Sequence, residues 1–292
     1  MFDLRYHVAS LAAVFLALII GILVGVGISG PVDNQKTKFL EEQVAKYQRR
    51  LDQSAAQSNS DAREQAAART FISETYPVLV RNRLRGKQIA VVFIGSADGG
   101  IRKSVNNLLE DSGAQQLRLR ALKVPIDVRQ LSAALRNQPE AVGLRGRQNV
   151  EALGRALGQE LMLGGDTPLW DSLVPALASE QTGVSKSPAD GVIVVRNVTP
   201  QRGATSRFLL GLYSGLASTA APAVGVESTD TVESATEAFA RGGLSTVDDV
   251  DKPVGRLATV LLLAGASSGQ YGVKDTADDV LPAFPPRNAA GG

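Results

Sequence analysis

The pattern of apolar and polar residues divides this chain into three regions, and the first is the most apolar. The stretch from Val8 to Ile28 contains no charged residue, and Ser10 is its only polar side chain. At about 1.5 Å per residue, a helix of this length spans roughly 30 Å, the thickness of a bilayer's hydrocarbon core. A removed signal peptide is the alternative, but its apolar region would normally be only about 7–15 residues long. The pattern therefore predicts an uncleaved, single-pass membrane helix. The basic residues on its two sides do not favour a cytoplasmic N-terminus, but long C-terminal domains can be translocated and a short N-terminal tail is easily left inside, so we expect the bulk of the chain outside the cytoplasm.

Small residues line one face of this predicted helix. They recur at every fourth position, at Ala9, Ala13, Ala17, Gly21 and Gly25. The last two form a GxxxG pair, a spacing that lets two helix backbones approach closely in lipid. The stripe predicts packing against a second copy or another membrane protein, although alanine and glycine are also common in membrane helices generally.

The second region is polar and helical, from about Asp33 to Phe71. Its apolar residues follow the a/d spacing of a coiled coil, at Leu40, Val44, Tyr47 and Leu51. This short seam predicts a parallel helical stalk, which is dimeric if the membrane helices pair. A single solvated helix acting as a spacer is the alternative.

The spacing of apolar residues changes again after Pro77. Short continuous apolar runs alternate there with segments whose apolar residues have helical spacing. The run Ile89–Ile94 predicts a buried strand, residues 101–109 predict a helix, and Leu117–Val124 predict a second strand, which together make a βαβ unit. Further strands are expected at Gly191–Val195, Ala223–Val226 and Leu244–Val247, and further helices at Val128–Leu135, Val150–Leu161, Pro168–Leu177, Phe208–Leu216, Val232–Phe239 and Pro253–Leu263, with Gln181–Asp190 as a separating loop.

These elements predict an α/β fold with a membrane helix, a coiled-coil stalk and a three-layer, parallel-sheet domain of flavodoxin-like type. The expected domains are residues 1–30 (anchor), 31–76 (stalk), 77–280 (α/β domain) and 281–292 (a disordered tail rich in proline, alanine and glycine).

Composition excludes several classes of function. The net charge of +2 lacks the concentrated basic excess of a nucleic-acid-binding protein. The chain has no cysteine, so disulfides, thiolate catalysis and cysteine metal sites are absent, and its one histidine, His7, precedes the predicted membrane helix. A Ser-His-Asp triad in the head is therefore impossible, and we expect no enzyme, no catalytic residue, no cofactor and no metal ligand.

Three stretches of the α/β region are candidate sites. Gly95–Gly100 lies between a strand and a helix, where doubly wound folds bind phosphate, but its spacing matches neither GxGxxG nor a P-loop and favours a tight turn. The acids Asp248, Asp249 and Asp251 could bind a hard cation, but Asp251 just before Pro253 favours a helix cap. The alternating Arg81, Arg83, Arg85 and Lys87 could contact anionic lipid or polymer, but a solvated edge is the default expectation.

The two ends of the chain resemble the MctB family of actinobacterial envelope proteins. The first match is the run from Ser10 to Leu18 followed by Gly21 and Gly25, and the second is the late block Leu244–Asp251. That block is followed by Gly255-Arg256 and then by the Gly269–Gly272 stretch, with Tyr271 and Gly272 at its end. The glycines of this last stretch predict a turn that carries one aromatic residue. The resemblance implies that Asp248, Asp249, Asp251, Gly255, Arg256, Tyr271 and Gly272 form a family motif of unknown role. The family is named for copper transport and has been described as an outer-membrane channel, so the resemblance implies a role in copper homeostasis.

Ligand chemistry conflicts with direct copper binding. Cu(I) prefers thiolate or thioether ligands and Cu(II) prefers imidazole, whereas the chain beyond His7 offers Met162 alone. Two hypotheses follow. The chain is either a copper transport component or accessory, or a non-enzymatic coiled-coil scaffold that binds a membrane partner, for example in regulating cell separation.

Overall fold

The computed structural model describes residues 13–22, 24, 34–97, 99–183 and 186–284, and the side chains of 34–41 and 140 are outside that description. Contacts divide the chain into two compact units, residues 1–68 and 69–292. In the first unit, residues 13–22 are helical and their side chains are exposed. No helix in the described part of the chain combines the length and apolar character that crossing a bilayer needs. The predicted span Val8–Ile28 falls partly outside these residues, and so it stays a prediction.

Helix α2 (Asn34–Val80) is longer than its sequence pattern predicts. The expected end near Phe71 was wrong, because the helix continues through Pro77 for almost another turn. Proline lacks a backbone N–H, but its carbonyl still accepts a bond from Arg81 at 3.2 Å. Burial of two apolar side chains stabilises the extension. Tyr76 and Val80 are 4% and 0% exposed and pack into the core of the second unit.

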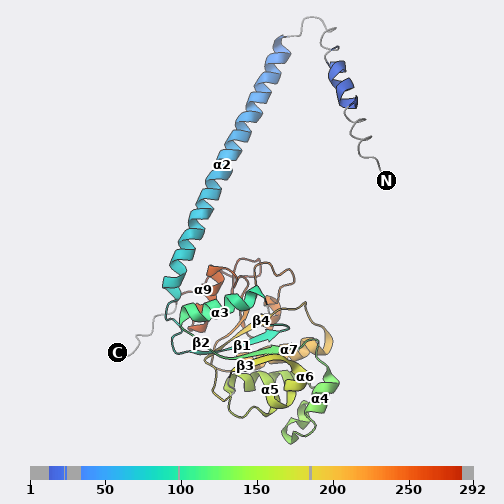
Figure 1. Cartoon of the computed structure of the whole chain (residues 1–292), viewed down its shortest axis with the longest axis vertical. Helices are drawn as coiled ribbons and strands as arrows, with labels where there is room; N and C mark the ends of the chain where they lie inside the picture. The colour runs from blue at the N-terminus through green and yellow to red at the C-terminus, as the bar shows by residue number, and fades with distance from the viewer. Residues whose placement is uncertain (1–12, 23, 25–33, 98, 184–185, 285–292) are drawn as a thin grey trace. The chain divides into compact units, whose positions relative to one another are not determined.

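The second unit is built on one sheet of seven described strands (Figure 1), in the order β3-β2-β1-β4-β5-β6-β7. The strands are β1 (Gln88–Ile94), β2 (Gln115–Leu122), β3 (Ala178–Gly183), β4 (Gly191–Arg196), β5 (Ala223–Val226), β6 (Ser245–Val247) and β7 (Gln270–Tyr271). Neighbours are parallel except β2 and β3. Without β3 and β7, the strands follow the 2-1-3-4-5 order of flavodoxin-like folds, so the predicted parallel α/β sheet is confirmed.

Helices cover both faces of the sheet, because the continuous apolar run of β1 is buried on both sides. Ile89, Val91 and Phe93 point to the layer that holds α3 and α9, and the intervening residues point to the layer of α5, α6 and α7 (Figure 1). The helices after α2 are α3 (Gly100–Ser112), α4 (Val128–Ala134), the 3₁₀ helix η1 (Pro139–Leu144), α5 (Val150–Leu163), α6 (Pro168–Leu177), α7 (Gly203–Ala217), α8 (Thr236–Arg241) and α9 (Pro253–Leu263).

Three local expectations were wrong. The start of the supposed loop Gln181–Asp190 belongs to the polar edge strand β3, which pairs antiparallel with β2. The helix expected at Val232–Phe239 begins only at Thr236, and Val232 is 96% exposed. The Gly269–Gly272 stretch contains β7, which adds to the sheet beside β6.

Two arginines of β2 are buried rather than solvated. Arg118 and Arg120 are 1% and 3% exposed, and they bind backbone carbonyls of neighbouring segments. Arg118 donates to Leu161 O at 2.8 Å, and Arg120 donates to Thr182 O at 2.7 Å. Burial lowers the pKa of Arg118 to about 10, with Arg120 adding repulsion. Arg120 thus adds a side-chain bond to the β2–β3 backbone ladder, whereas Arg118 ties β2 to α5 and to the segment after β3.

Candidate functional site at the carboxyl end of the sheet

The motif residues from two distant parts of the sequence meet where β6 and β7 end. The Asp248 carboxylate accepts the backbone N–H of Val273 at 2.8 Å and that of Lys274 at 3.0 Å. Gly272 has a φ of +142°, and a Cβ at that position would lie 2.0 Å from Asp248 Oδ1. Only glycine leaves room for this carboxylate, so Asp248 and Gly272 act together to fasten the segment after β7 to the end of β6.

Asp249 is the most perturbed acid of the motif. It is 1% exposed, and its Oδ1 makes no hydrogen bond within the described residues. Burial, together with the neighbouring negative charges of Asp248 and Asp251, raises the pKa of Asp249 to about 6. A Cβ on Gly255 would lie 2.3 Å from Asp249 Oδ1, so helix α9 can approach this carboxyl only with glycine there.

The motif does not form a cation site in the part of the chain that the structure describes. Within those ranges, no group of three or more histidine, cysteine, aspartate or glutamate residues is arranged to hold a metal ion. The three motif aspartates have separate partners instead, which explains why their closeness in sequence does not create a shared coordination sphere.

The expected helix cap at Asp251 was wrong. The N-cap of α9 is Lys252, and no side chain caps the helix there, although Pro253 does occupy the first turn. Asp251 Oδ1 instead accepts the Thr229 N–H at 2.7 Å and the Thr229 hydroxyl at 2.9 Å. Burial opposes ionisation of Asp251, but these hydrogen bonds and the Lys252 charge outweigh it and lower the pKa. Asp251 therefore fixes the loop after β5.

Arg256 connects the motif to the last turns of α2. Its guanidinium carbon lies 5.0 Å from the centroid of the Tyr76 ring, a cation–π distance, and its Nη1 donates to Asp251 O at 3.4 Å. Tyr271 has a local role, since its hydroxyl donates to Ser267 O at 3.0 Å. The motif thus braces both the sheet edge and the end of the long helix.

Sequence reasoning missed Glu227 and Lys274, which form the buried ion pair of this region. Lys274 Nζ lies 2.7 Å from Glu227 Oε1, and Glu227 is 1% exposed. The other carboxylate oxygen accepts the Ala235 N–H at 2.6 Å, which fixes the chain just before α8. The available signal was the position of Glu227 directly after the predicted strand Ala223–Val226, because polar residues at that end of a parallel sheet often build sites.

The loops that border the ligand crevice of flavodoxin-like folds contact each other closely in this protein. This crevice lies between the loops after β1 and β4, where a Cβ on Gly95 would meet Val198 Cγ1 at 2.4 Å. The Asn197 side chain donates to Ser96 O at 3.1 Å and ties the two loops together. The described part of the Gly95–Gly100 stretch thus has the contacts of a packed turn, although residue 98 lies outside the description.

The basic stretch before β1 is mostly a solvated edge. Arg81, Arg85 and Lys87 are exposed, and Lys87 Nζ lies 3.7 Å from the Asp190 carboxylate. Arg83 differs, since its Nε donates to Leu79 O at 2.7 Å and its guanidinium faces the Phe284 ring.

The predicted packing residues of the first unit keep exposed side chains in this single chain. Ala13, Ala17 and Gly21 lie in the helix at 13–22, whereas Gly25 is outside the described residues. Along α2, the seam residues Val44, Tyr47 and Leu51 are 57%, 60% and 68% exposed, and the side chain of Leu40 is outside the description.

A family model described as "copper transport outer membrane protein, MctB" matches residues 1–282. The chain belongs to this family. The MctB match covers the predicted anchor, the stalk and the whole sheet with its C-terminal motif, so it does not rest on one segment alone. A search of curated proteins gives no match.

Membership of the MctB family implies a role in copper transport or homeostasis, and the family description is consistent with membrane association. In this MctB-family chain, Met162 is 1% exposed and packs in the core around α5. The thioether that the sequence offers to copper beyond the N-terminus is therefore committed to packing.

Proposed function

We propose that this chain is a single-pass, membrane-anchored MctB-family protein whose α/β head serves copper transport or homeostasis as an accessory component. The observation that carries the proposal is the MctB family match over residues 1–282 in a chain with almost no copper ligands. The head acts on copper through a membrane partner and not through a copper centre of its own.

The ligand inventory supports the accessory role. Protein copper sites are built from several cysteine, methionine or histidine side chains. This chain has no cysteine, one histidine and two methionines, Met1 and Met162. Met162, on helix α5, is buried in the core rather than presented at a surface. The lack of cysteine and the single histidine also remove the thiolate nucleophile and nearly all imidazole bases, which supports a non-enzymatic role.

Exposed apolar side chains in the first unit support the anchor and the stalk. Residues 13–22 present Val14, Phe15, Leu16, Leu18, Ile19, Ile20 and Ile22, each at least 52% exposed. Such a continuous apolar surface is typical of a segment that lies in lipid. We propose that the small-residue stripe and the exposed seam of α2 hold two copies together, with a further membrane protein as partner. The copper family match does not favour the scaffold hypothesis of cell separation.

A Cu(I) competition titration of the full chain in detergent micelles tests the accessory role. We expect no site tighter than about micromolar, because a single buried thioether cannot complete a coordination sphere. A stoichiometric site of higher affinity would show that the head carries copper itself.

The absence of cysteine makes topology directly measurable. Val232 is 96% exposed, so Val232→Cys gives one accessible thiol in the head. We expect an impermeant maleimide to label it in intact cells, and to label Asp3→Cys, which precedes the predicted span, only after lysis. The reverse pattern would place the head inside, and labelling of both variants in intact cells would refute a membrane-spanning segment.

A further inference from the structure

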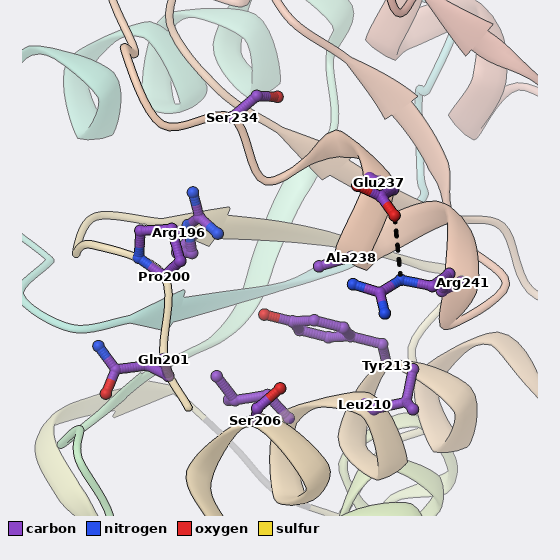
Figure 2. A pocket seen from close by; sticks show the side chains of 11 residues that line it. Arg196, Pro200, Gln201, Ser206, Leu210, Tyr213, Ser234, Glu237, Ala238 and Arg241 are labelled. Atoms are coloured by element: carbon purple, nitrogen blue, oxygen red, sulfur yellow. Dashed lines mark ion pairs between the residues drawn. The ribbon is translucent and has the colours of Figure 1, made fainter. Parts of the chain in front are cut away.

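A pocket of about 270 Å³ opens beside the carboxyl end of β4, between α7 and α8. Arg196 enters it from the end of β4, Tyr213 from α7 and Arg241 from α8 (Figure 2). The volume is just under the range of roughly 300–1,000 Å³ for drug-sized ligands, so it fits a small molecule. Glu227 positions one wall, because it holds Ser234 and the N–H of Ala235 directly before α8.

Tyr213 is the most informative residue of the pocket. The residue is only 2% exposed, yet its hydroxyl makes no hydrogen bond to any other described residue and points into the pocket (Figure 2). Phe239 fixes the ring by edge-to-face packing, with centroids 5.1 Å apart. Burial raises the pKa of Tyr213, so the hydroxyl stays protonated. The hydroxyl faces the open space of the pocket, where a ligand oxygen can accept its hydrogen bond.

Arg196 places a cation at the same pocket. Its Nη2 donates to the carbonyl of Glu233, but its Nε is buried and has no hydrogen-bond partner within the described residues. Burial lowers the pKa of Arg196, and the neighbouring Tyr213, Glu227 and Glu233 oppose that shift without cancelling it. The guanidinium charge is therefore incompletely compensated by the protein, as expected where an anion binds.

Arg241 supplies a second guanidinium from the rim. Its Nε lies 3.8 Å from Glu237, and both side chains are well exposed, at 65% and 85%. Exposed pairs of this kind contribute little stability, so Arg241 can exchange this partner for a ligand. The lining holds two guanidiniums against the single carboxylate of Glu237, which leaves an excess of positive charge around a hydroxyl donor.

We propose that this pocket is a binding site for a small oxyanion, the phosphate or carboxylate group of a small molecule, held by Arg196, Tyr213 and Arg241. Guanidinium groups bind both kinds of oxyanion through paired N–H donors. The tyrosine hydroxyl adds a third hydrogen-bond donor beside the two guanidiniums. The site goes beyond the proposed copper role and does not depend on it, since neither the arginines nor the tyrosine is a copper ligand.

Calorimetric titration of the full chain in detergent micelles tests the site, with inorganic phosphate and succinate as separate probes at constant ionic strength. Tyr213→Phe removes only the hydroxyl, and we expect about a tenfold loss of affinity for the anion that binds, the usual effect of one hydrogen bond to a charged group. Arg241→Gln is expected to weaken binding by roughly threefold, because the rim charge is exposed.

Two matched variants serve as controls. Tyr271→Phe removes a hydroxyl that bonds Ser267 O outside the pocket, and Arg155→Gln breaks an i,i+4 pair with Glu151 of the same 3.8 Å length on α5. Neither should change anion affinity, and fluorescence of the single tryptophan verifies that every variant is folded. The preferred probe decides between phosphate and carboxylate. The proposal is overturned if neither anion binds the wild-type chain at concentrations up to about 10 mM, which corresponds to roughly the weakest useful affinity. It is also overturned if folded Tyr213→Phe binds the anion as tightly as the wild type does.

Discussion

Substitution of Gly272 by alanine is the sharpest test of how the family motif holds the sheet together. The new Cβ would lie 2.0 Å from Oδ1, 2.2 Å from Cγ and 2.5 Å from Oδ2 of Asp248. These distances are far below van der Waals contact, so the carboxylate must leave its position. Both backbone N–H groups that it accepts, those of Val273 and Lys274, then lose their partner.

The magnitude follows from these contacts. Hydrogen bonds to a charged group contribute about 1.5–3 kcal/mol each, so losing two costs about 3 kcal/mol or more. Forcing a side chain to a φ of +142° adds about 1 kcal/mol. We therefore expect the free energy of unfolding to fall by about 4 kcal/mol. For a unit that spans residues 69–292, this corresponds to a decrease in Tm of about 8–16 °C.

Thermal unfolding followed by Trp170 fluorescence measures this effect, because Trp170 is the only tryptophan and is 1% exposed in the core. Gly265→Ala is the matched control, since Gly265 also has a positive φ, of +97°, but open space around its Cβ position. It should lose only the backbone contribution, about 2–4 °C. In a double-mutant cycle, Asp248→Ala and Gly272→Ala should be markedly less than additive. Equal Tm values for the two glycine variants, or additive losses, would refute the reasoning.

Two further predictions concern the same region. The pKa of Asp249 is raised from 3.8 to about 6, so this group stabilises the fold below about pH 4, and that stabilisation is lost as the pH rises to about 6. In Asp249→Asn, the free energy of unfolding measured with urea should therefore change less across this pH range. An unchanged pH profile would contradict the raised pKa of Asp249. Asp251, whose pKa is lowered, acts only below its ordinary range and does not obscure this window. Arg256→Gln should remove about 1 kcal/mol of cation–π stabilisation and speed amide hydrogen exchange around Tyr76. Unaltered exchange around Tyr76 would show that the Arg256–Tyr76 contact does not hold the end of α2.

The regular elements of the head were predictable because their signals are local. Continuous apolar runs mark β1 and β4, and Gly113 ends α3 in the left-handed conformation that glycine favours. Strand β3 could not be read in this way. Its residues are mostly polar, and it is held by its pairing with β2 and by Arg120, whose acceptor Thr182 O lies 62 residues away in the sequence.

The motif and the pocket show the same contrast. The closeness of Asp248, Asp249 and Asp251 was visible in the sequence, but their separate partners were not, so the prediction of a helix cap failed. Tyr213 looks like one more apolar residue of a helix, and only the fold reveals that its hydroxyl faces a pocket and bonds no other described residue. A site assembled from single residues of β4, α7 and α8 has no characteristic spacing along the chain.

The proposed copper role is tested most directly by cell-associated copper in a strain that lacks this gene, beside its parent, at fixed external copper. We expect copper to accumulate in the deletion strain. The intact gene should restore the parental level, and so should Met162→Leu, a volume-conserving change at a buried core position. A gene in which residues 8–28 are replaced by a cleavable signal should not restore it, because the head would lose its membrane partner. Copper levels that are the same with and without the gene would contradict the account.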